Sequence, residues 1–332
     1  MRRSFTAIAM LVAMAILFTA APTVARSNIA LGVSDPKSQN MAAVETYKQR
    51  YGRYPAMWSL WSTWGARGSD KVCDTGESCA FPTDMVDQLM DKGITPVIWW
   101  QYADPQRPSA WLYSNQSLLK GKHNAYIRQW ASEAGRVSRA HGTKSIIVRP
   151  FHEATGTWFP WSIGLKGNTM KNYKEAWRFL YRQVRAAGAS RAQVKFLWSN
   201  YTPSKRAYPG DSFVEFVGFT VLNWGARKGK WRPMPPQVDF KVKQAAKFTK
   251  KPIIIAETAS FHRGGNKAKW LKQGYLATYR RYPRVRGILY LDAATANDGK
   301  HPNWRLVLPR DGSAVNAYRW LSQKPGFQGG FR

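Results

Sequence analysis

"SIIVRPFHEATGTWFPW", residues 145–161, is the stretch that is most informative about the fold. Its three β-branched residues, 146–148, form an apolar run of the kind found in buried strands. A histidine and a glutamate, His152 and Glu153, come soon after the run, and a glycine and two tryptophans follow them. The pattern predicts a strand over 145–153 that carries a carboxylate to its carboxyl end.

Similar apolar runs recur along the chain and alternate with amphipathic stretches that have helical spacing. Helices are predicted at 83–92, 123–141, 170–188, 236–250 and 265–282. Strands are predicted at 29–34, 56–61, 94–101, 145–153, 194–199, 214–221, 252–257 and 287–292. This alternation favours an α/β protein with one (β/α)8 TIM barrel. A doubly wound open sheet is the alternative, but no G-x-G-x-x-G loop follows the first predicted strand.

Residues 1–26 have the order of segments found in secretory signals. Arg2 and Arg3 precede an uncharged run over 4–21, and small residues surround Ala25. We predict a signal peptide over 1–26, cut after Ala21 or Ala25, with an uncleaved anchor helix as the alternative. The remaining residues, 27–332, then form one domain that is secreted or held in the periplasm or cell envelope, without a membrane span.

Cys73 and Cys79 are the only two cysteines. In an exported protein such a pair is expected to form a disulfide that closes a small loop, and two free thiols are the alternative. A zinc site would need more ligands than the sequence groups together, so no metal is predicted.

The charge of the chain is strongly positive and unevenly distributed. Lys and Arg number 51 against 19 Asp and Glu, which gives a formal net charge of +32. Residues 28–104 hold seven basic and nine acidic side chains, whereas residues 105–332 hold 41 and ten. Such a field attracts polyanions, including acidic polysaccharides, anionic lipid headgroups and nucleic acid. A solvated basic surface suited to a negatively charged cell envelope is the alternative.

Two predicted strands end in glutamates, at positions where barrel enzymes hold their chemistry. Glu153 ends the fourth strand, and Glu257, in "KPIIIAETAS" (251–260), ends the seventh. Cleavage of a glycosidic bond needs two flanking carboxyl groups, and sugars stack their C–H faces on aromatic rings. A glutamate after a strand is more often a surface or ion-paired residue, so the argument depends on the pair. Gly156 excludes an H-E-x-x-H zinc motif.

Aromatic and amide residues occupy several other predicted strand ends, including Trp99, Asn223 and Trp224. Trp99 and Trp100 are consecutive, so their rings should point to opposite faces of the strand and at most one can face the barrel mouth.

The motifs around the two glutamates resemble those of glycoside hydrolase family 26, the β-mannanase family of the large retaining (β/α)8 clan. The stretch 146–162 looks like the family's strand-four motif, and 251–260 looks like its strand-seven motif. Weaker similarities are found in "FLWSN" (196–200), "YPGDSFVEFVGF" (208–219) and "NWRL" (303–306). The resemblance implies a glycoside hydrolase domain over 27–332 that needs no cofactor.

The resemblance also implies roles for particular residues. Glu153 would be the general acid/base and Glu257 the nucleophile of a retaining, endo-acting enzyme. Arg149 would orient the strand-four carboxylate region, and His152 would help to bind sugar beside the acid. Trp158, Trp161 and Trp224 would contribute to the sugar platform. Asn223 and Trp99 complete the predicted substrate-binding set.

This sequence departs from the family pattern at Leu222, where members often have a tyrosine that hydrogen-bonds the nucleophile, and at Ala154. Loss of the donor would raise the pKa of Glu257. Because of this departure, a glycan-binding protein with weak or no activity on a hydrolase scaffold is an alternative. A charge-driven polyanion or nucleic-acid binder is a further alternative, although the sequence has no nucleic-acid-binding motif. We expect a monomer whose partner is a polysaccharide, neutral and mannan-like or anionic, with no specific nucleic acid.

Overall fold

The computed structural model describes residues 27–36, 39–64, 80–103, 113–142, 144–225, 230–293, 303–307 and 312–331. The predicted signal peptide, 1–26, and both cysteines, Cys73 and Cys79, lie outside these ranges. Within them, no helix combines the length and apolar character needed to cross a membrane.

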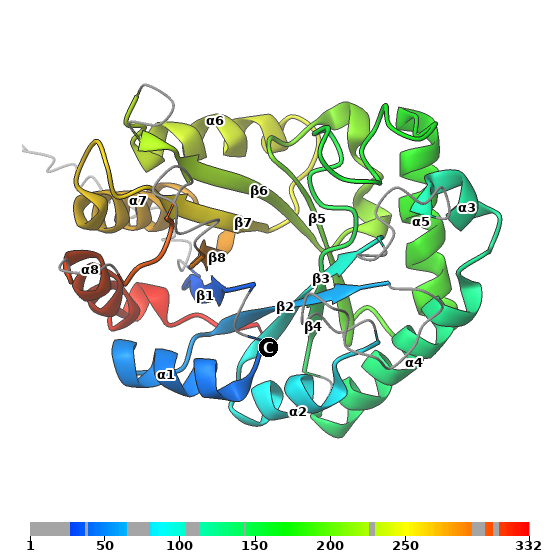
Figure 1. Ribbon diagram of the computed structural model, residues 1–332, viewed down its shortest axis with the longest axis horizontal. Helices are drawn as coiled ribbons and strands as arrows, with labels where there is room; N and C mark the ends of the chain where they lie inside the picture. Colours follow the sequence, from blue (N-terminus) through cyan, green and yellow to red (C-terminus); the bar gives the residue numbers. More distant parts are fainter. Residues whose placement is uncertain are drawn as a thin grey trace, which may run out of the picture.

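Eight parallel strands form a closed barrel in the order in which they occur along the chain, as Figure 1 shows. This topology confirms the prediction of a single (β/α)8 barrel. The strands are β1 (Ala30–Ser34), β2 (Met57–Thr63), β3 (Thr95–Gln101), β4 (Ile146–Val148), β5 (Val194–Asn200), β6 (Phe216–Asn223), β7 (Ile253–Ser260) and β8 (Val285–Leu291).

The helices surround the strands in Figure 1. They are α1 (Met41–Tyr51), α2 (Thr83–Asp91), α3 (Asn115–Leu119), α4 (Asn124–Ala140), α5 (Met170–Ala186), α6 (Met234–Ala246), α7 (Lys267–Arg281) and α8 (Ser313–Ser322). The segment 201–215, which is described throughout, joins β5 to β6 with two short 3₁₀ turns, η2 (Lys205–Ala207) and η3 (Asp211–Phe213), in place of an α-helix.

Local signals in the sequence explain where the long helices begin. Thr169 precedes α5 and forms a capping box: its hydroxyl accepts from the amide of Asn172, whose side chain accepts from the amide of Thr169. Asn266 caps α7 in the same position by accepting from the amide of Lys269. These bonds satisfy amide groups that the helix itself leaves unpaired.

The strand alternation separates two apolar layers. Inside the barrel lies a small core that includes Met57, Val97 and Trp99, and a larger core fills the space between strands and helices. Trp100 belongs to the outer layer, where its ring stacks on Trp130 of α4 with centroids 4.0 Å apart. The prediction that Trp99 and Trp100 point to opposite faces is therefore confirmed.

The predicted strand over 145–153 is too long. The strand β4 ends at Val148, and a series of turns follows it. Phe151 and Glu153 have φ values of 46° and 52°, a left-handed conformation that extended strands exclude and that non-glycine residues rarely adopt. Conversely β7 continues to Ser260, so Glu257 lies within the strand and not at its end.

Candidate active site

Glu257 projects from β7 towards a buried arginine that follows β4. Nη2 of Arg149 lies 2.8 Å from Oε1 of Glu257, and the arginine side chain is fully buried. Its Nε donates to the hydroxyl of Ser199 on β5 at 2.6 Å, and its guanidinium lies 4.2 Å from the ring of Trp99. Arg149 thus links β4, β5 and β7 and is fixed by contacts on three sides.

Burial raises the pKa of Glu257 to about 7. The guanidinium of Arg149 opposes this shift, whereas the charge of Glu153 adds to it. The carboxyl group of Glu257 therefore changes its charge close to neutral pH.

Glu153 lies on the turn after β4 and is held there by its backbone and its side chain. Its amide donates to the carbonyl of Ser199 at 3.0 Å. Its Oε1 accepts from the hydroxyl of Thr220 at 2.5 Å, and its Oε2 accepts from Nε1 of Trp158 at 3.2 Å. These contacts compensate for the left-handed backbone at Glu153, since such strain persists only where the surroundings enforce it.

Thr220 of β6 brings the two glutamates together. It donates to Glu153 and is the register partner of Glu257 on the neighbouring strand β7. The ladder between β6 and β7 shifts register between Phe219 and Thr220. A bulge of this kind re-aims the side chains beside it, and here it directs Glu257 to the level of Thr220.

Among the described residues near Glu153, the aromatic residue most open to solvent is Trp158. It is 57% exposed, so part of its indole is available for stacking. A Cβ added to Gly156 would lie 2.4 Å from Cζ2 of Trp158. Glycine at 156 is therefore required for the indole to lie across the turn and reach Glu153. The amide of Thr155, which donates to Oδ1 of Asn200 at 3.1 Å, ties this turn to β5.

His152 and Trp161 are buried beneath the turn. Burial, reinforced by the Arg149 charge, holds the pKa of His152 well below its usual range, so the ring is neutral. Trp161 is 1% exposed, donates from Nε1 to the carbonyl of His152 at 2.8 Å and stacks on Phe159. In this arrangement Trp161 supports the turn and offers no open face to a sugar.

The remaining predicted residues form the surroundings of the site. Trp99 is buried against Arg149 and Trp61. Asn223 is also buried: its Nδ2 donates to Ser260 at 2.9 Å, and its Oδ1 accepts from the amides of Gly225 and Arg232. Trp224 is partly exposed and packs edge-on against Trp304. Arg149 was expected to orient the region of Glu153, but its ion pair is with Glu257.

The sequence analysis did not identify Thr220, Ser199 or Lys241 as residues of this site. The alternation along β6 would have placed Thr220 on the inner face, because it follows Phe216 by four residues and Phe216 belongs to the inner core. Its pairing with Glu153 spans 67 positions in the chain and carries no local signal.

Over the ranges that the structure describes, no group of three or more His, Cys, Asp or Glu side chains is placed to hold a metal ion.

Comparisons with known proteins show what the chain is similar to. Residues 106–232 match the family model described as "Glycosyl hydrolase family 26". The chain is 32% identical over 245 residues to Endoglucanase H of Acetivibrio thermocellus. The matched region covers 70% of this chain and 25% of that protein. It is 25% identical over 190 residues to Mannan endo-1,4-beta-mannosidase of Bifidobacterium adolescentis, covering 51% and 18%. A GH26 beta-mannanase structure from Bacteroides ovatus superposes with a TM-score of 0.66 at 16% identity, covering 91% and 90%.

The chain spans a quarter or less of the length of these two curated relatives. The fold and the two glutamates define a (β/α)8-barrel protein with one carboxylate on the turn after β4 and one within β7, connected through Thr220. The chain belongs to glycosyl hydrolase family 26.

Proposed function

We propose that this protein is an exported, retaining glycoside hydrolase that cleaves a β-linked polysaccharide within the chain. Glu153 is its general acid/base and Glu257 its nucleophile. The observation that carries the proposal is the bridge through Thr220, which donates to one glutamate and pairs in register with the other. An exposed indole, Trp158, lies on the same turn as Glu153, where a sugar could stack.

In the first step, an oxygen of Glu257 attacks the anomeric carbon while the bond to the departing oxygen breaks and Glu153 donates its proton to that oxygen. A covalent glycosyl-enzyme results. In the second step, Glu153 removes a proton from water, the water oxygen bonds to the anomeric carbon, and Glu257 leaves as a carboxylate. No redox partner or cofactor takes part in either step.

The productive state has a proton on Glu153 and a charge on Glu257. Burial opposes a charge on Glu257, whereas its ion pair with Arg149 favours one. The charge of Glu153 is one of the causes that raise the pKa of Glu257. Protonation of Glu153 removes that cause and so favours ionisation of its partner, as in other coupled carboxyl pairs.

The names of the relatives, an endoglucanase and a mannan endo-1,4-beta-mannosidase, support a β-linked glucan or mannan as substrate and an endo mode of action. The charge of the chain supports an anionic polymer. Arg232, which follows β6, and Arg263, which follows β7, are both exposed. Their positions after these strands place cations near the carboxyl ends of the barrel, where a negatively charged glycan would be held.

A glycan-binding protein with little turnover is the second candidate, and Leu222 is the observation that favours it. An aliphatic side chain at this position provides no hydrogen bond to Glu257.

The decisive experiment measures the release of reducing ends from a panel of mannan, mixed-linkage β-glucan and anionic β-linked polysaccharides. We expect release from one polymer by the wild type, and loss of release in Glu257→Ala. Binding to a polymer without release, by both proteins, would instead establish the second candidate. Failure to bind or cleave any of them would overturn the glycan assignment.

The anionic substrate is tested by the same assay at increasing NaCl concentration. Attraction between exposed charges is screened within about 10 Å at 0.1 M salt. Cleavage of an anionic polymer should therefore weaken with salt while cleavage of a neutral one does not. Equal salt dependence for both classes would remove the anionic substrate from the proposal.

Export and the disulfide are tested on protein purified from the producing cells. N-terminal sequencing should find the mature chain beginning after Ala21 or Ala25, and reduction should raise the intact mass by two hydrogen atoms. A full-length N-terminus or an unchanged mass would contradict the respective prediction.

A further inference from the structure

Lys241, on the inner face of α6, is a buried lysine close to the proposed catalytic pair. Its side chain is 5% exposed, although lysine is among the residues most rarely buried. The ammonium donates to the carbonyl of Tyr201, just after β5, at 2.7 Å, and to the carbonyl of Thr220 on β6. It also lies 4.1 Å from the ring of Tyr201.

No carboxylate forms an ion pair with Lys241 in the described part of the chain. The acidic group that acts on it is Glu153, whose charge favours the protonated ammonium. Burial has the opposite and larger effect and lowers the pKa of Lys241 to about 8. A buried cation that has carbonyl acceptors but no ion-paired carboxylate is costly, so its position against β6 and the residue after β5 calls for a role other than stability.

The contacts of Lys241 lead directly to Glu153. Thr220 accepts from Lys241 through its carbonyl and donates to Glu153 through its hydroxyl. The same residue stands where the ladder between β6 and β7 shifts register. A bulge weakens the local ladder, so the backbone at Thr220 depends more on contacts from outside the sheet. The ammonium of Lys241 supplies such a contact.

We propose that Lys241 is a positioning residue: it fixes the backbone of Thr220 and thereby holds the Glu153 carboxyl where it can give and take the proton. The proposal rests on the proposed function of Glu153 as acid/base. Lys241 does not touch the substrate in this role, because Thr220 lies between it and Glu153.

The charge of Lys241 adds a dependence on pH. The groups that face it are Glu153 from the turn after β4 and Tyr201 from the end of β5, with Arg232 acting on Tyr201 from before α6. Above about pH 8 the ammonium becomes a neutral amine, which still has two N–H donors for its two carbonyl partners. The geometry can then persist while the favourable field at the Glu153 carboxylate is lost.

The test compares Lys241→Met with Lys243→Met, a matched control. Lys243 lies on the same helix, its side chain is 71% exposed, and it pairs with Asp239 at the protein surface. Each variant is assayed on the polymer that the wild type cleaves and on the 2,4-dinitrophenyl β-glycoside of the same sugar. The dinitrophenolate leaves without a proton, so its departure needs no general acid, whereas the polymer requires one.

We expect Lys241→Met to lower kcat on the polymer about tenfold to hundredfold, which is part of the usual contribution of a general acid. For the dinitrophenyl glycoside, kcat/KM should stay within about threefold of the wild type, because glycosylation then depends on Glu257 alone. Lys243→Met should change neither rate. Thr220→Val removes the hydroxyl that donates to Glu153 and should reproduce the pattern of Lys241→Met. It also keeps the test available if Lys241→Met folds poorly.

Equal losses on both substrates in Lys241→Met and Thr220→Val would show a general structural role and overturn the proposal. Unchanged rates on the polymer in both variants would overturn it as well. A wild type that cleaves neither substrate would instead refute the proposed function, and the role of Lys241 would fall with it.

Discussion

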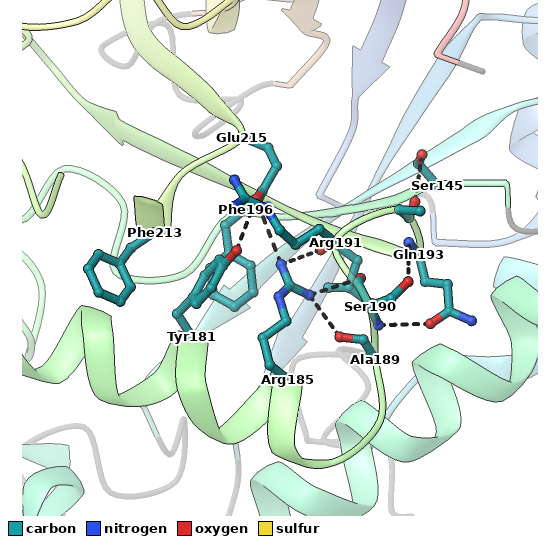
Figure 2. Close-up of polar contacts among 12 residues, drawn as sticks. Ser145, Tyr181, Arg185, Ala189, Ser190, Arg191, Gln193, Phe196, Phe213 and Glu215 are labelled. Atoms are coloured by element: carbon teal, nitrogen blue, oxygen red, sulfur yellow. Dashed lines mark hydrogen bonds and ion pairs between the residues drawn. The ribbon is translucent and has the colours of Figure 1, made fainter. Parts of the chain in front are cut away.

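Two glutamates at opposite ends of the barrel, Glu215, which is partly buried, and Glu257, which is buried, have contrasting surroundings. Glu215 precedes β6 at the amino-terminal end, and Figure 2 shows its carboxylate among Tyr181, Arg185 and Arg191. It accepts from the amide of Phe196 at 2.7 Å, from the Tyr181 hydroxyl at 3.1 Å and from Nε of Arg191 at 3.0 Å, with Arg185 3.6 Å away. Glu257 at the other end has Arg149 as its one cationic partner among the described residues.

The difference shows how one barrel separates stability from reactivity. At Glu215, several donors bind one carboxylate, which thereby joins β5, β6 and α5. At Glu257, burial outweighs its single guanidinium and raises the pKa to about 7, so the group can change its charge during a reaction. In barrels of this type the amino-terminal end contributes stability and the carboxyl-terminal end holds the chemistry.

The largest expected effect separates the two glutamates by activity. Glu257→Gln should lower kcat on the polysaccharide by at least about 10³-fold, because no other group can form the glycosyl-enzyme. Glu215→Gln should stay within about threefold of the wild type, since it lies at the far end of the barrel. The comparison is measured by reducing-end release under identical conditions. Comparable losses in the two variants would contradict the division of roles.

Glu215, which should contribute little to activity, should contribute to the stability of the fold. In Glu215→Gln, Arg185 and Arg191 lose their anionic partner, and we expect the free energy of unfolding to fall by about 2 kcal/mol. Urea denaturation monitored by tryptophan fluorescence measures this change. Lys243→Met, which removes only an exposed ion pair, serves as control and should cost at most about 0.5 kcal/mol. A Glu215→Gln variant as stable as this control would show that the cluster is not a stabilising one.

The raised pKa of Glu257 predicts the acidic side of the pH–activity profile. Below about pH 7 the free enzyme holds Glu257 protonated, so kcat/KM should fall about tenfold for each pH unit. The same shift acts on stability: the folded-state pKa is above the ordinary value, so this group's stabilising contribution is present below about pH 4.5 and is lost as the pH rises through about 7.

Leu222 allows this prediction to be tested with a single hydroxyl group. Leu222 lies on the same face of β6 as Thr220, two residues nearer the carboxyl end of the strand. Leu222→Tyr should supply a donor to Glu257, lower its pKa and move the acidic limb down by about one pH unit. Leu222→Phe is the matched control, with the ring but without the hydroxyl. A shift of the same size in both variants would attribute the effect to packing.

The sequence was sufficient to predict the barrel because its strands are local patterns. Runs such as 252–257 are apolar and rich in β-branched residues, and all eight predicted strands begin within two residues of the start of the observed strand. The strand predicted at 145–153 extends five residues too far because its apolar and aromatic composition does not reveal the left-handed backbone at Phe151 and Glu153. That conformation is imposed by contacts with β5 and β6.

The candidate site was predictable only in part, for the same physical reason. Glu153 and Glu257 could be proposed because each follows or lies in a buried strand. The residues that surround them come from distant positions: Arg149 reaches Glu257 across the barrel, and Thr220 and Lys241 approach from β6 and α6. The burial of an individual tryptophan also could not be predicted from the sequence. Trp158 and Trp161 are three residues apart, yet one is open to solvent and the other is enclosed.

The smallest expected effect concerns these two tryptophans. Trp158→Leu should raise KM for the polymer about threefold to tenfold, because it removes an aromatic face worth about 1 kcal/mol. Trp158→Phe keeps a face but loses the Nε1 donor to Glu153, so its effect should fall on kcat and leave KM nearly unchanged. Gly156→Ala should resemble Trp158→Leu, since its Cβ would displace the indole.

Trp161→Phe, in contrast, should lower the free energy of unfolding with little change in KM, because its ring is enclosed and its Nε1 donates to the carbonyl of His152. A rise in KM for Trp161→Phe equal to that for Trp158→Leu would show that the enclosed ring also contacts the sugar, and that the turn opens when substrate binds.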